Sequence, residues 1–268
     1  MKNRVSHIEL WNLIGTSATP HIIDVRIAED VLDNPTLIPG AVQRDYTLAN
    51  EWAARFIGRQ VVVVCHKGLK LSEGVAAQLR VLGVKAGVLE GGNVAWKTAG
   101  LPAVPLAIMP ERTTGKTVWV TRERPKIDRI ACPWLIRRFV DPFAEFLFVE
   151  GSQVKGVAER FNATPFDIDN VHWSHRGETC TFDTMIAEFG LASPALETVA
   201  RIVRGADTAR LDLAPQAAGL LAISLGLSKL YDGDLAQLEA GMLIYDALYE
   251  WARSAKGESH NWPSKVAK

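Results

Sequence analysis

The stretch VVVVCHKGLKLSEGVAAQLRVLG, residues 61–83, holds a strand pattern, a short basic turn and a helix pattern in direct succession. The valine run at 61–64 is typical of a buried strand. Apolar residues then recur at helical spacing over residues 72–82, where they form one face of a helix. Cys65 therefore lies at the carboxyl end of a strand, and open α/β sheets bind their ligands beyond that end.

Strand and helix patterns also alternate on both sides of this stretch. Ser6 and Glu9 have the spacing of a capping box at the start of a helix. HIIDV at 21–25 and AGVLE at 86–90 are short apolar runs of the buried-strand type. This alternation predicts an α/β domain with a parallel sheet and helices on its faces.

The chain has 268 residues, and two domains are expected for this length. Its 30 Lys and Arg residues balance its 30 Asp and Glu residues, so any preference for anions must be local. The sequence has no apolar run near the roughly 20 residues that span a bilayer, and its first residues do not resemble a signal peptide. Cysteines at 65, 132 and 180 form no disulfide framework. These features predict a cytoplasmic protein that does not bind membranes.

The two kinds of pattern separate along the chain. We expect the α/β domain at residues 1–103, a linker at 104–116, a mainly helical domain at 117–254 and a flexible tail at 255–268. The linker collects prolines, a glycine and charges, which are typical of loops. After one strand-like segment, TVWVT, helical patterns occur near residues 129–140, 182–189, 195–204, 214–231 and 234–254.

Cys65 has two interpretations. Ser72 is a candidate N-cap for the following helix, and the helix start together with His66, Lys67 and Lys70 favours a thiolate. A free cysteine has a pKa near 8.5, and a shift to about 6 would leave it mostly ionised at neutral pH. A buried structural cysteine is the alternative, but the basic turn favours the reactive interpretation.

Several motifs stand in one order: IIDVR at 22–26, IPGAV at 38–42, Cys65 with Gly68, and GG-x-x-x-W-x-x-x-G-L-P at 91–102. Together they resemble a rhodanese, or sulfurtransferase, domain over about residues 5–103. The resemblance implies that Cys65 accepts sulfur as a persulfide and that sulfur transfer needs no cofactor. It also implies a substrate-binding loop, which consists of His66, Lys67, Gly68, Leu69, Lys70 and Leu71.

Asp24 and Arg26 match the scaffold pair that this family places beside the loop, and a structural ion pair is the alternative for them. The loop itself departs from the family pattern Cys-x-x-Gly-x-Arg-Ser. Lys70 replaces the arginine, which keeps the charge but loses the bidentate fork, and Leu71 is an extra residue before the serine. Phosphatases of the same fold have longer loops for larger tetrahedral anions, so the preferred oxyanion stays open.

The second domain begins with TVWVTRERPKIDRIACPWLIRRFVD at 117–141, which groups six basic residues against three acidic ones. The run is short and the chain neutral, so a small-anion site or a solvated helix face is favoured over nucleic acid. Pro133 suits the first turn of a helix. Cys132 is therefore expected at or beside a helix start, which could lower its pKa, but a packed core is the favoured interpretation of this cysteine. The candidate binding residues of this run are Arg122, Arg124, Lys126, Asp128 and Arg129.

Further along, VHWSHRGETCTFD at 171–183 carries side chains that can bind a metal, but in no compact zinc spacing. Asp207, which we expect directly after a helix at a glycine-marked exit, could join His175 and Asp128 as a ligand once the chain folds. A metal in this domain is thus one alternative, and its identity is unknown.

Four long strings resemble the C-terminal domain of the chromate-resistance protein family over about residues 117–254: VTRERPKIDRIACPWLIRRFVDP, SHRGETCTFD, IVRGADT and LAPQAAGLLAISLGLS. The resemblance implies an association with chromate tolerance, and no catalytic residue is carried over to this domain. We expect a sulfurtransferase-like protein that acts on a small sulfur donor or oxyanion and a thiol acceptor. The alternatives are an oxyanion-sensing regulatory protein, or a chromate reductase that uses Cys65 with Cys132 or Cys180.

Overall fold

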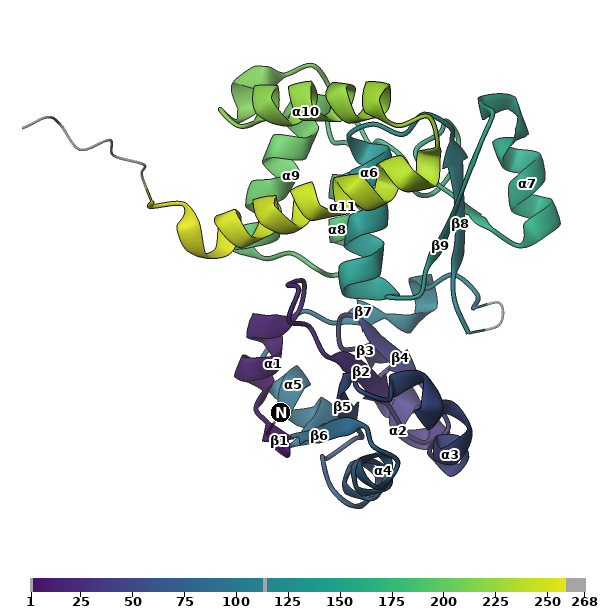
Figure 1. Ribbon diagram of the computed structural model, residues 1–268, viewed down its shortest axis with the longest axis vertical. Helices are drawn as coiled ribbons and strands as arrows, with labels where there is room; N and C mark the ends of the chain where they lie inside the picture. Colours follow the sequence, from purple (N-terminus) through teal and green to yellow (C-terminus); the bar gives the residue numbers. More distant parts are fainter. Residues whose placement is uncertain (1, 113–114, 259–268) are drawn as a thin grey trace, which may run out of the picture.

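The computed structural model describes residues 2–112 and 115–258. Its first domain is built on a five-stranded sheet with the order β1-β6-β5-β2-β4, in which every neighbouring pair is parallel. The predicted parallel α/β fold is therefore confirmed (Figure 1). The strands are β1 Arg4–Val5, β2 His21–Asp24, β4 Ala41–Gln43, β5 Gln60–Val64 and β6 Lys85–Leu89.

Helices cover both faces of this sheet, and the valine run explains how. Because strand side chains alternate between faces, Val62 and Val64 join the same hydrophobic cluster as Leu10 and Trp96. Val61, Val63 and Cys65 instead join the cluster that α3 and α4 cover. The helices are α1 His7–Leu13, α2 Ala28–Asp33, α3 Ala49–Trp52, α4 Lys70–Val81 and α5 Gly92–Thr98. The capping box of Ser6 and Glu9 at the start of α1 is present as predicted.

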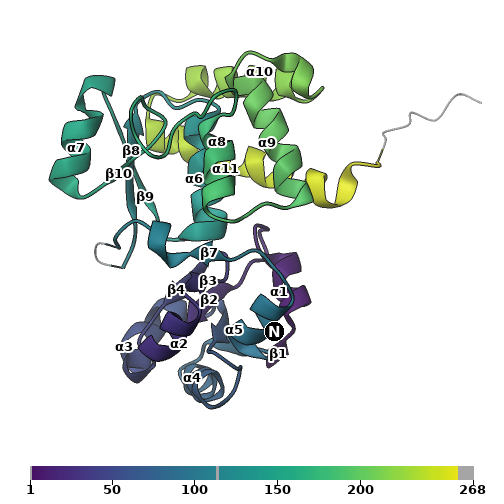
Figure 2. The ribbon, with the colours of Figure 1, turned by 180° about the vertical axis from the view of Figure 1, so that it is seen from behind.

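The second domain is mainly helical, as predicted, but its single expected strand belongs to a three-stranded parallel sheet with the order β10-β8-β9. These strands are β8 Val118–Arg122, β9 Glu145–Val149 and β10 Thr164–Pro165. Helix α7 lies on one side of the sheet, and α6, α8 and α9 lie on the other (Figures 1 and 2). The helices are α6 Asp128–Leu135, which a π-helical turn extends to Val140, α7 Val154–Phe161, α8 Thr181–Glu188, α9 Pro194–Asp207, α10 Ala217–Leu230 and α11 Asp234–Glu250.

The two domains are packed together through one continuous hydrophobic cluster. Gly15 has a positive φ of 82°, and a Cβ there would lie within 3.0 Å of the rings of Phe139 and Tyr249. The Gly40 N–H donates to the Phe139 carbonyl at 2.6 Å, and the His21 ring stacks on Phe143 with 5.9 Å between centroids. His21 begins β2 and Gly40 precedes β4, so the second domain packs against the amino ends of these strands.

The segment expected as a linker is partly ordered into the first domain. Val104–Pro105 form β7, which pairs antiparallel with β3, Thr36–Leu37. Of the expected tail, residues 259–268 lie outside the described residues, and residue 255 still belongs to the π-helical turn after α11. In the described part of the chain, no helix combines the length and the apolarity that crossing a bilayer requires.

Candidate functional site

Cys65 follows directly after β5 and lines a pocket of about 640 Å³. The residue is only 4% exposed, so its sulfur is reached through this pocket rather than from the open surface. Lys67 and Lys70 stand exposed around the pocket, and Asp30 lines it as well. The whole lining consists of Ile27, Asp30, Cys65, His66, Lys67, Leu69, Lys70 and Leu71. The predicted loop therefore surrounds one pocket, and of its residues Gly68 does not line it.

The loop is held by the first turn of α5. The Cys65 carbonyl accepts from the Asn93 N–H at 3.0 Å, and the His66 carbonyl accepts from the Val94 N–H at 3.0 Å. Gly68 and Gly92 have φ values of 66° and 58°, and a Cβ on either one would overlap the backbone of the other segment. Glycine is needed at both positions because only a bare backbone permits this approach and this left-handed conformation.

Asp24 and Arg26 support the same turn. The Arg26 guanidinium forms a buried ion pair with Asp24 at 2.7 Å. It also donates to the Asn34 carbonyl at 2.9 Å and to Asn93 Oδ1 at 3.2 Å. Neither Asp24 nor Arg26 lines the Cys65 pocket. Their contacts are those of a structural ion pair that positions Asn93. The Asn93 N–H in turn holds the Cys65 carbonyl.

Backbone donors are available around the pocket. No described residue accepts a hydrogen bond from the backbone N–H groups of residues 66–71. Unpaired amides at a helix start form an anion-binding site. Helix α4 begins at Lys70, so the prediction that Ser72 caps it is wrong. Ser72 is its third residue, and Ser72 Oγ lies 3.1 Å from Cys65 Sγ, a contact that the capping interpretation missed.

The other two cysteines are in different surroundings. Cys132 and Cys180 are fully buried, and burial together with the nearby Asp128 carboxylate raises the pKa of both thiols. Pro133 lies inside α6 rather than in its first turn. Cys132 is therefore the fifth residue of that helix. The favoured packed-core interpretation is confirmed, and the alternative of a lowered pKa is wrong. These surroundings suppress the thiolate that a redox relay would need.

A second pocket, of about 660 Å³, opens in the second domain. Its cationic side chains are Arg122, Lys155 and His175, and its lining is completed by Gly151, Ser152, Asp167, Ile168, Asp169, Asn170 and Ser174. It shares no lining residue with the Cys65 pocket. Helix α4 lies at the end of the first domain farthest from the second (Figures 1 and 2), so these two pockets are separate sites.

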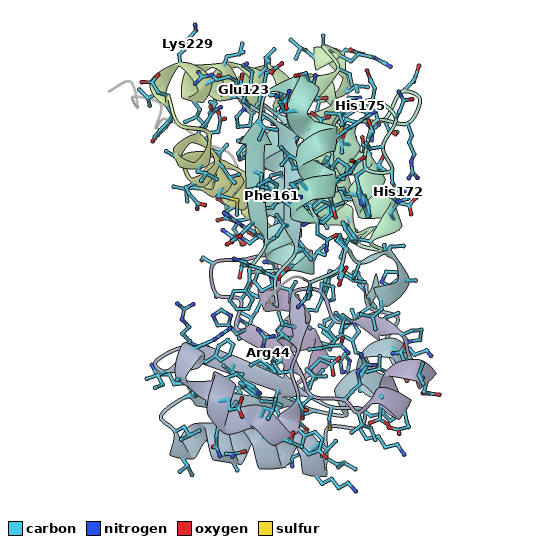
Figure 3. All side chains as sticks on the ribbon, turned by 90° about the vertical axis from the view of Figure 1, so that its right-hand side faces the viewer. Arg44, Glu123, Phe161, His172, His175 and Lys229 are labelled. Carbon is cyan, nitrogen blue, oxygen red and sulfur yellow. The ribbon has the colours of Figure 1, made fainter. Side chains whose placement is uncertain are left out.

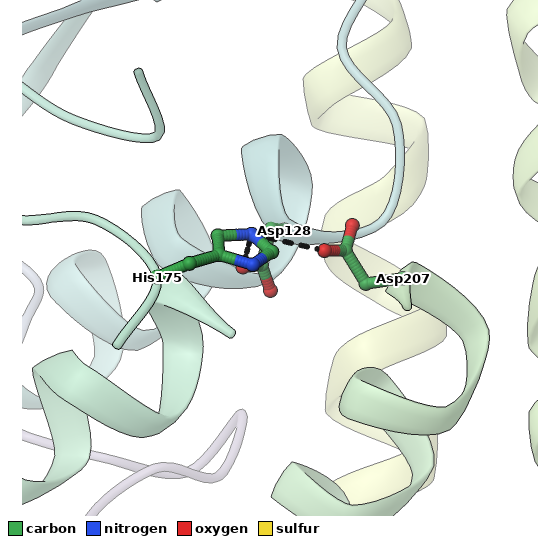
Figure 4. Close-up of side chains that lie close together, drawn as sticks. All are labelled: Asp128, His175 and Asp207. Atoms are coloured by element: carbon green, nitrogen blue, oxygen red, sulfur yellow. Dashed lines mark ion pairs between the residues drawn. The ribbon is translucent and has the colours of Figure 1, made fainter. Parts of the chain in front are cut away.

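At one side of this second pocket the fold brings Asp128, His175 and Asp207 together, as the sequence suggested they could meet (Figure 4). His175 Nε2 lies 3.2 Å from Asp207 Oδ2 and 3.6 Å from Asp128 Oδ2. Asp207 is the last residue of α9 rather than a residue beyond it. Gly205 lies inside that helix and does not end it. Its role is one of packing, because a side chain at this position would collide with Ala217.

Asp167, which sequence reasoning missed, completes this group. Its Oδ1 lies 3.4 Å from His175 Nε2, and its Oδ2 lies 3.4 Å from both the Arg122 and the Arg129 guanidinium. Hydrogen bonds to Asp167 and Asp207 raise the pKa of His175 to about 10. Burial and the neighbouring carboxylates raise the pKa of Asp128. Asp167 is the second residue after strand β10. A carboxylate just after a strand is the sequence signal that could have revealed it.

Three of the basic residues predicted to bind, Arg124, Lys126 and Arg129, do not line this pocket, although Arg129 pairs with Asp167. Arg124 donates to the carbonyls of Tyr231 and Asp232 at 3.0 and 3.3 Å, so it fastens the turn between α10 and α11. Lys126 is half-buried and does not line the pocket. Lys155 of helix α7 lines the pocket instead. No sequence pattern pointed to this residue.

Comparison with known proteins identifies the two domains. The family model described as "ChrB, C-terminal domain" matches residues 119–252, half of the chain. The chain belongs to this ChrB family. A second model, the rhodanese-like domain, matches residues 6–99, and it confirms the rhodanese resemblance of the first domain.

A curated relative, Protein ChrB of Cupriavidus metallidurans, is 33% identical over 132 residues. The match covers 49% of this chain and 39% of that protein, so the ChrB-family chain described here spans well under half of its relative. Among solved structures, a rhodanese-like domain protein from Staphylococcus aureus is 27% identical, with a TM-score of 0.32, over 35% of this chain and 91% of that one. Thiosulfate sulfurtransferase from Pseudomonas aeruginosa is 23% identical, with a TM-score of 0.31, over 38% of this chain and 19% of that one.

Proposed function

We propose that this chain is a rhodanese-type sulfurtransferase whose Cys65 carries sulfur as a persulfide, and that it acts in the cytoplasm in resistance to chromate or related oxyanions. The observation that carries the proposal is the setting of Cys65. Cys65 lines a pocket together with Lys67 and Lys70, and no acceptor in residues 2–112 or 115–258 pairs with the backbone N–H groups of the loop. The membership in the ChrB family supports the link to oxyanion resistance.

The first half-reaction is a nucleophilic attack by the Cys65 thiolate on the outer sulfur of a donor such as thiosulfate. The bond between the two sulfurs of thiosulfate breaks, and sulfite leaves with its electron pair. The product on the protein is the Cys65 persulfide. No further oxidant or reductant is consumed, because sulfane sulfur simply changes its partner.

The second half-reaction regenerates the free Cys65 thiolate. An acceptor thiolate or cyanide attacks the outer sulfur of the persulfide, the sulfur–sulfur bond to Cys65 breaks, and the Cys65 thiolate leaves. Ser72 Oγ, 3.1 Å from the sulfur, can donate a hydrogen bond to that thiolate. Loop N–H groups with Lys67 and Lys70 stabilise the anion that departs in the first half-reaction.

The direct test is mass spectrometry of the intact protein after incubation with thiosulfate. The expected result is a gain of one sulfur atom, which peptide mapping assigns to residue 65 and which cyanide removes. The Cys65→Ser variant should keep the fold and lose both the adduct and the turnover. Retained turnover in that variant would remove the proposal.

A second candidate function, oxyanion binding in the second domain, is favoured by Arg122 and Lys155, which line the same pocket with Ser152 and Asn170. If this pocket binds chromate, sulfate or phosphate, the melting temperature should rise with that anion in the Cys65→Ser background, and Lys155→Ala should reduce the rise. Three anions without effect on the melting temperature would exclude this function.

A further inference from the structure

We propose that the second domain binds one first-row divalent transition-metal ion between Asp128, His175 and Asp207. This site is independent of the sulfur chemistry at Cys65, because the two pockets share no residue. The three side chains come from elements that are distant in sequence: the start of α6, the loop before α8 and the end of α9. Figure 4 shows the two carboxylates facing the imidazole ring from different sides.

The distances within the group suit a bound ion. One ligand atom from each residue can be chosen so that all three lie within 4.8 Å of one another. Metal–ligand bonds of about 2.0–2.2 Å place neighbouring ligand atoms roughly 3.0–3.6 Å apart. His175 Nε2 lies 3.2 Å from Asp207 Oδ2 and 3.6 Å from Asp128 Oδ2. These two distances already lie in that range.

A second observation points to a missing partner at Asp128. This side chain is fully buried, and its Oδ2 accepts from the N–H groups of Thr181 and Phe182 at 2.6 and 3.3 Å. Among the described residues, Oδ1 of the same carboxylate has no hydrogen-bond partner. An unsatisfied buried oxygen is costly and requires an explanation. A metal ion that the Asp128 carboxylate binds through Oδ1, or through both of its oxygens, supplies it.

The backbone holds Asp128 in place. The preceding residue, Ile127, has a φ of 39°, which is rare for a β-branched side chain. Its N–H donates to Ser224 Oγ at 3.1 Å, and its carbonyl accepts from the Tyr245 hydroxyl at 3.0 Å. The helices α10 and α11 thus clamp the residue that begins α6, and the carboxylate is positioned before any ion binds.

The donor set limits the kind of ion. One imidazole nitrogen with two carboxylates suits Mn²⁺, Fe²⁺ or Zn²⁺ better than soft ions, which prefer sulfur. Cys180 is not among the three grouped ligands, and its Sγ donates to Asp183 Oδ2 at 3.2 Å. The His175 side chain is 41% exposed and lines the pocket, so an ion can enter from solvent.

The test uses the full chain, free of any purification tag and treated with EDTA. Mn²⁺ binding is followed by electron paramagnetic resonance of the free ion, and Zn²⁺ is added as a competitor. We expect one Mn²⁺ per chain, displaced by Zn²⁺. His175→Gln and Asp207→Asn should each weaken binding by at least about 10-fold. Both residues are partly exposed, and circular dichroism checks that the variants fold.

His172→Gln is the matched control. His172 lies on the same side of the domain as His175 (Figure 3), but its ion-pair partner is Glu188, at 3.7 Å. This variant should bind Mn²⁺ like the wild type. The proposal is overturned if the wild type binds neither ion with a Kd below about 1 mM, or if either folded site variant binds as tightly as the wild type.

Discussion

Ser72 Oγ lies 3.1 Å from Cys65 Sγ, across the turn that joins β5 to α4. The hydroxyl is fully buried and donates its one proton to the Leu69 carbonyl at 3.1 Å, so it must rotate away from that carbonyl to donate to the sulfur. A buried hydroxyl beside a sulfur can donate to it when the sulfur becomes a thiolate. This contact links the first turn of the helix to the chemistry proposed for the strand end.

Replacing this hydroxyl should slow the reaction without unfolding the domain. In Ser72→Ala the thiolate loses one hydrogen bond, and a hydrogen bond to a charged group is worth about 1.5–3 kcal/mol. We expect alkylation of Cys65 by iodoacetamide and sulfur transfer from thiosulfate to fall by roughly tenfold or more. Ser152→Ala, in the other pocket, serves as the control. Unchanged rates in Ser72→Ala would show that the hydroxyl does not assist the thiolate.

A methyl group on Gly92 should destabilise the loop that holds Cys65. A Cβ there would lie within 3.0 Å of the Cys65 and His66 carbonyl oxygens, and the φ of 58° is unfavourable for alanine. We expect Gly92→Ala to lower the free energy of unfolding by about 2–4 kcal/mol, as measured by urea denaturation. Gly74 lies inside α4 with open space around it, so Gly74→Ala should instead raise stability by roughly 0.5–1 kcal/mol. Equal effects at both positions would contradict this account.

The three cysteines should differ sharply in reactivity in the native protein. Cys65 lines a pocket, whereas burial raises the pKa of the Cys132 and Cys180 thiols. Mass mapping after brief treatment with iodoacetamide at neutral pH should find the label on Cys65 alone, and on all three in denaturant. Native labelling of Cys132 or Cys180 at the rate of Cys65 would revive the redox-relay alternative.

The same two thiols predict a loss of stability in alkali. Their folded pKa values are raised above the ordinary value of 9.0, so above about pH 9 the unfolded chain loses protons that the native protein keeps. Below that pH the free energy of unfolding is unaffected by these thiols. Above it, the free energy of unfolding falls as pH rises, by at most about 1.4 kcal/mol per pH unit for each thiol. Urea denaturation from neutral pH to about pH 10.5 measures this slope. Cys180→Ala should flatten it, and an unchanged slope in that variant would assign the effect to other groups.

Much of the Cys65 site was predictable because it is local. Strand, turn and helix follow one another within residues 61–83, and the glycines at 68 and 92 mark where backbones approach. The position of Ser72 was not predictable in the same way. A serine near a helix start can cap it or lie one turn inside, and the loop conformation decides which.

The pocket of the second domain was harder to predict, because its residues are distant from one another in the sequence. The binding role expected for Arg124 and Lys126 followed from their place in a basic run, but tertiary contacts direct Arg124 to the turn after α10. Lys155 reaches the pocket from a helix that carries no motif, and Asp167 reaches it from the loop after β10, a strand that the sequence pattern did not predict. Charge density along a chain does not predict which side chains share one pocket.

The sequence by itself determined the parallel sheet, the mainly helical second domain and the position of Cys65 at a strand end, because these depend on periodicity and on contacts between neighbours in the chain. Only the tertiary structure decided that Asp128, His175 and Asp207 meet. They are 47 and 32 residues apart along the chain, and their approach depends on how α6, α8 and α9 pack around a shared core. Long-range packing brings such groups together, and no local pattern records it.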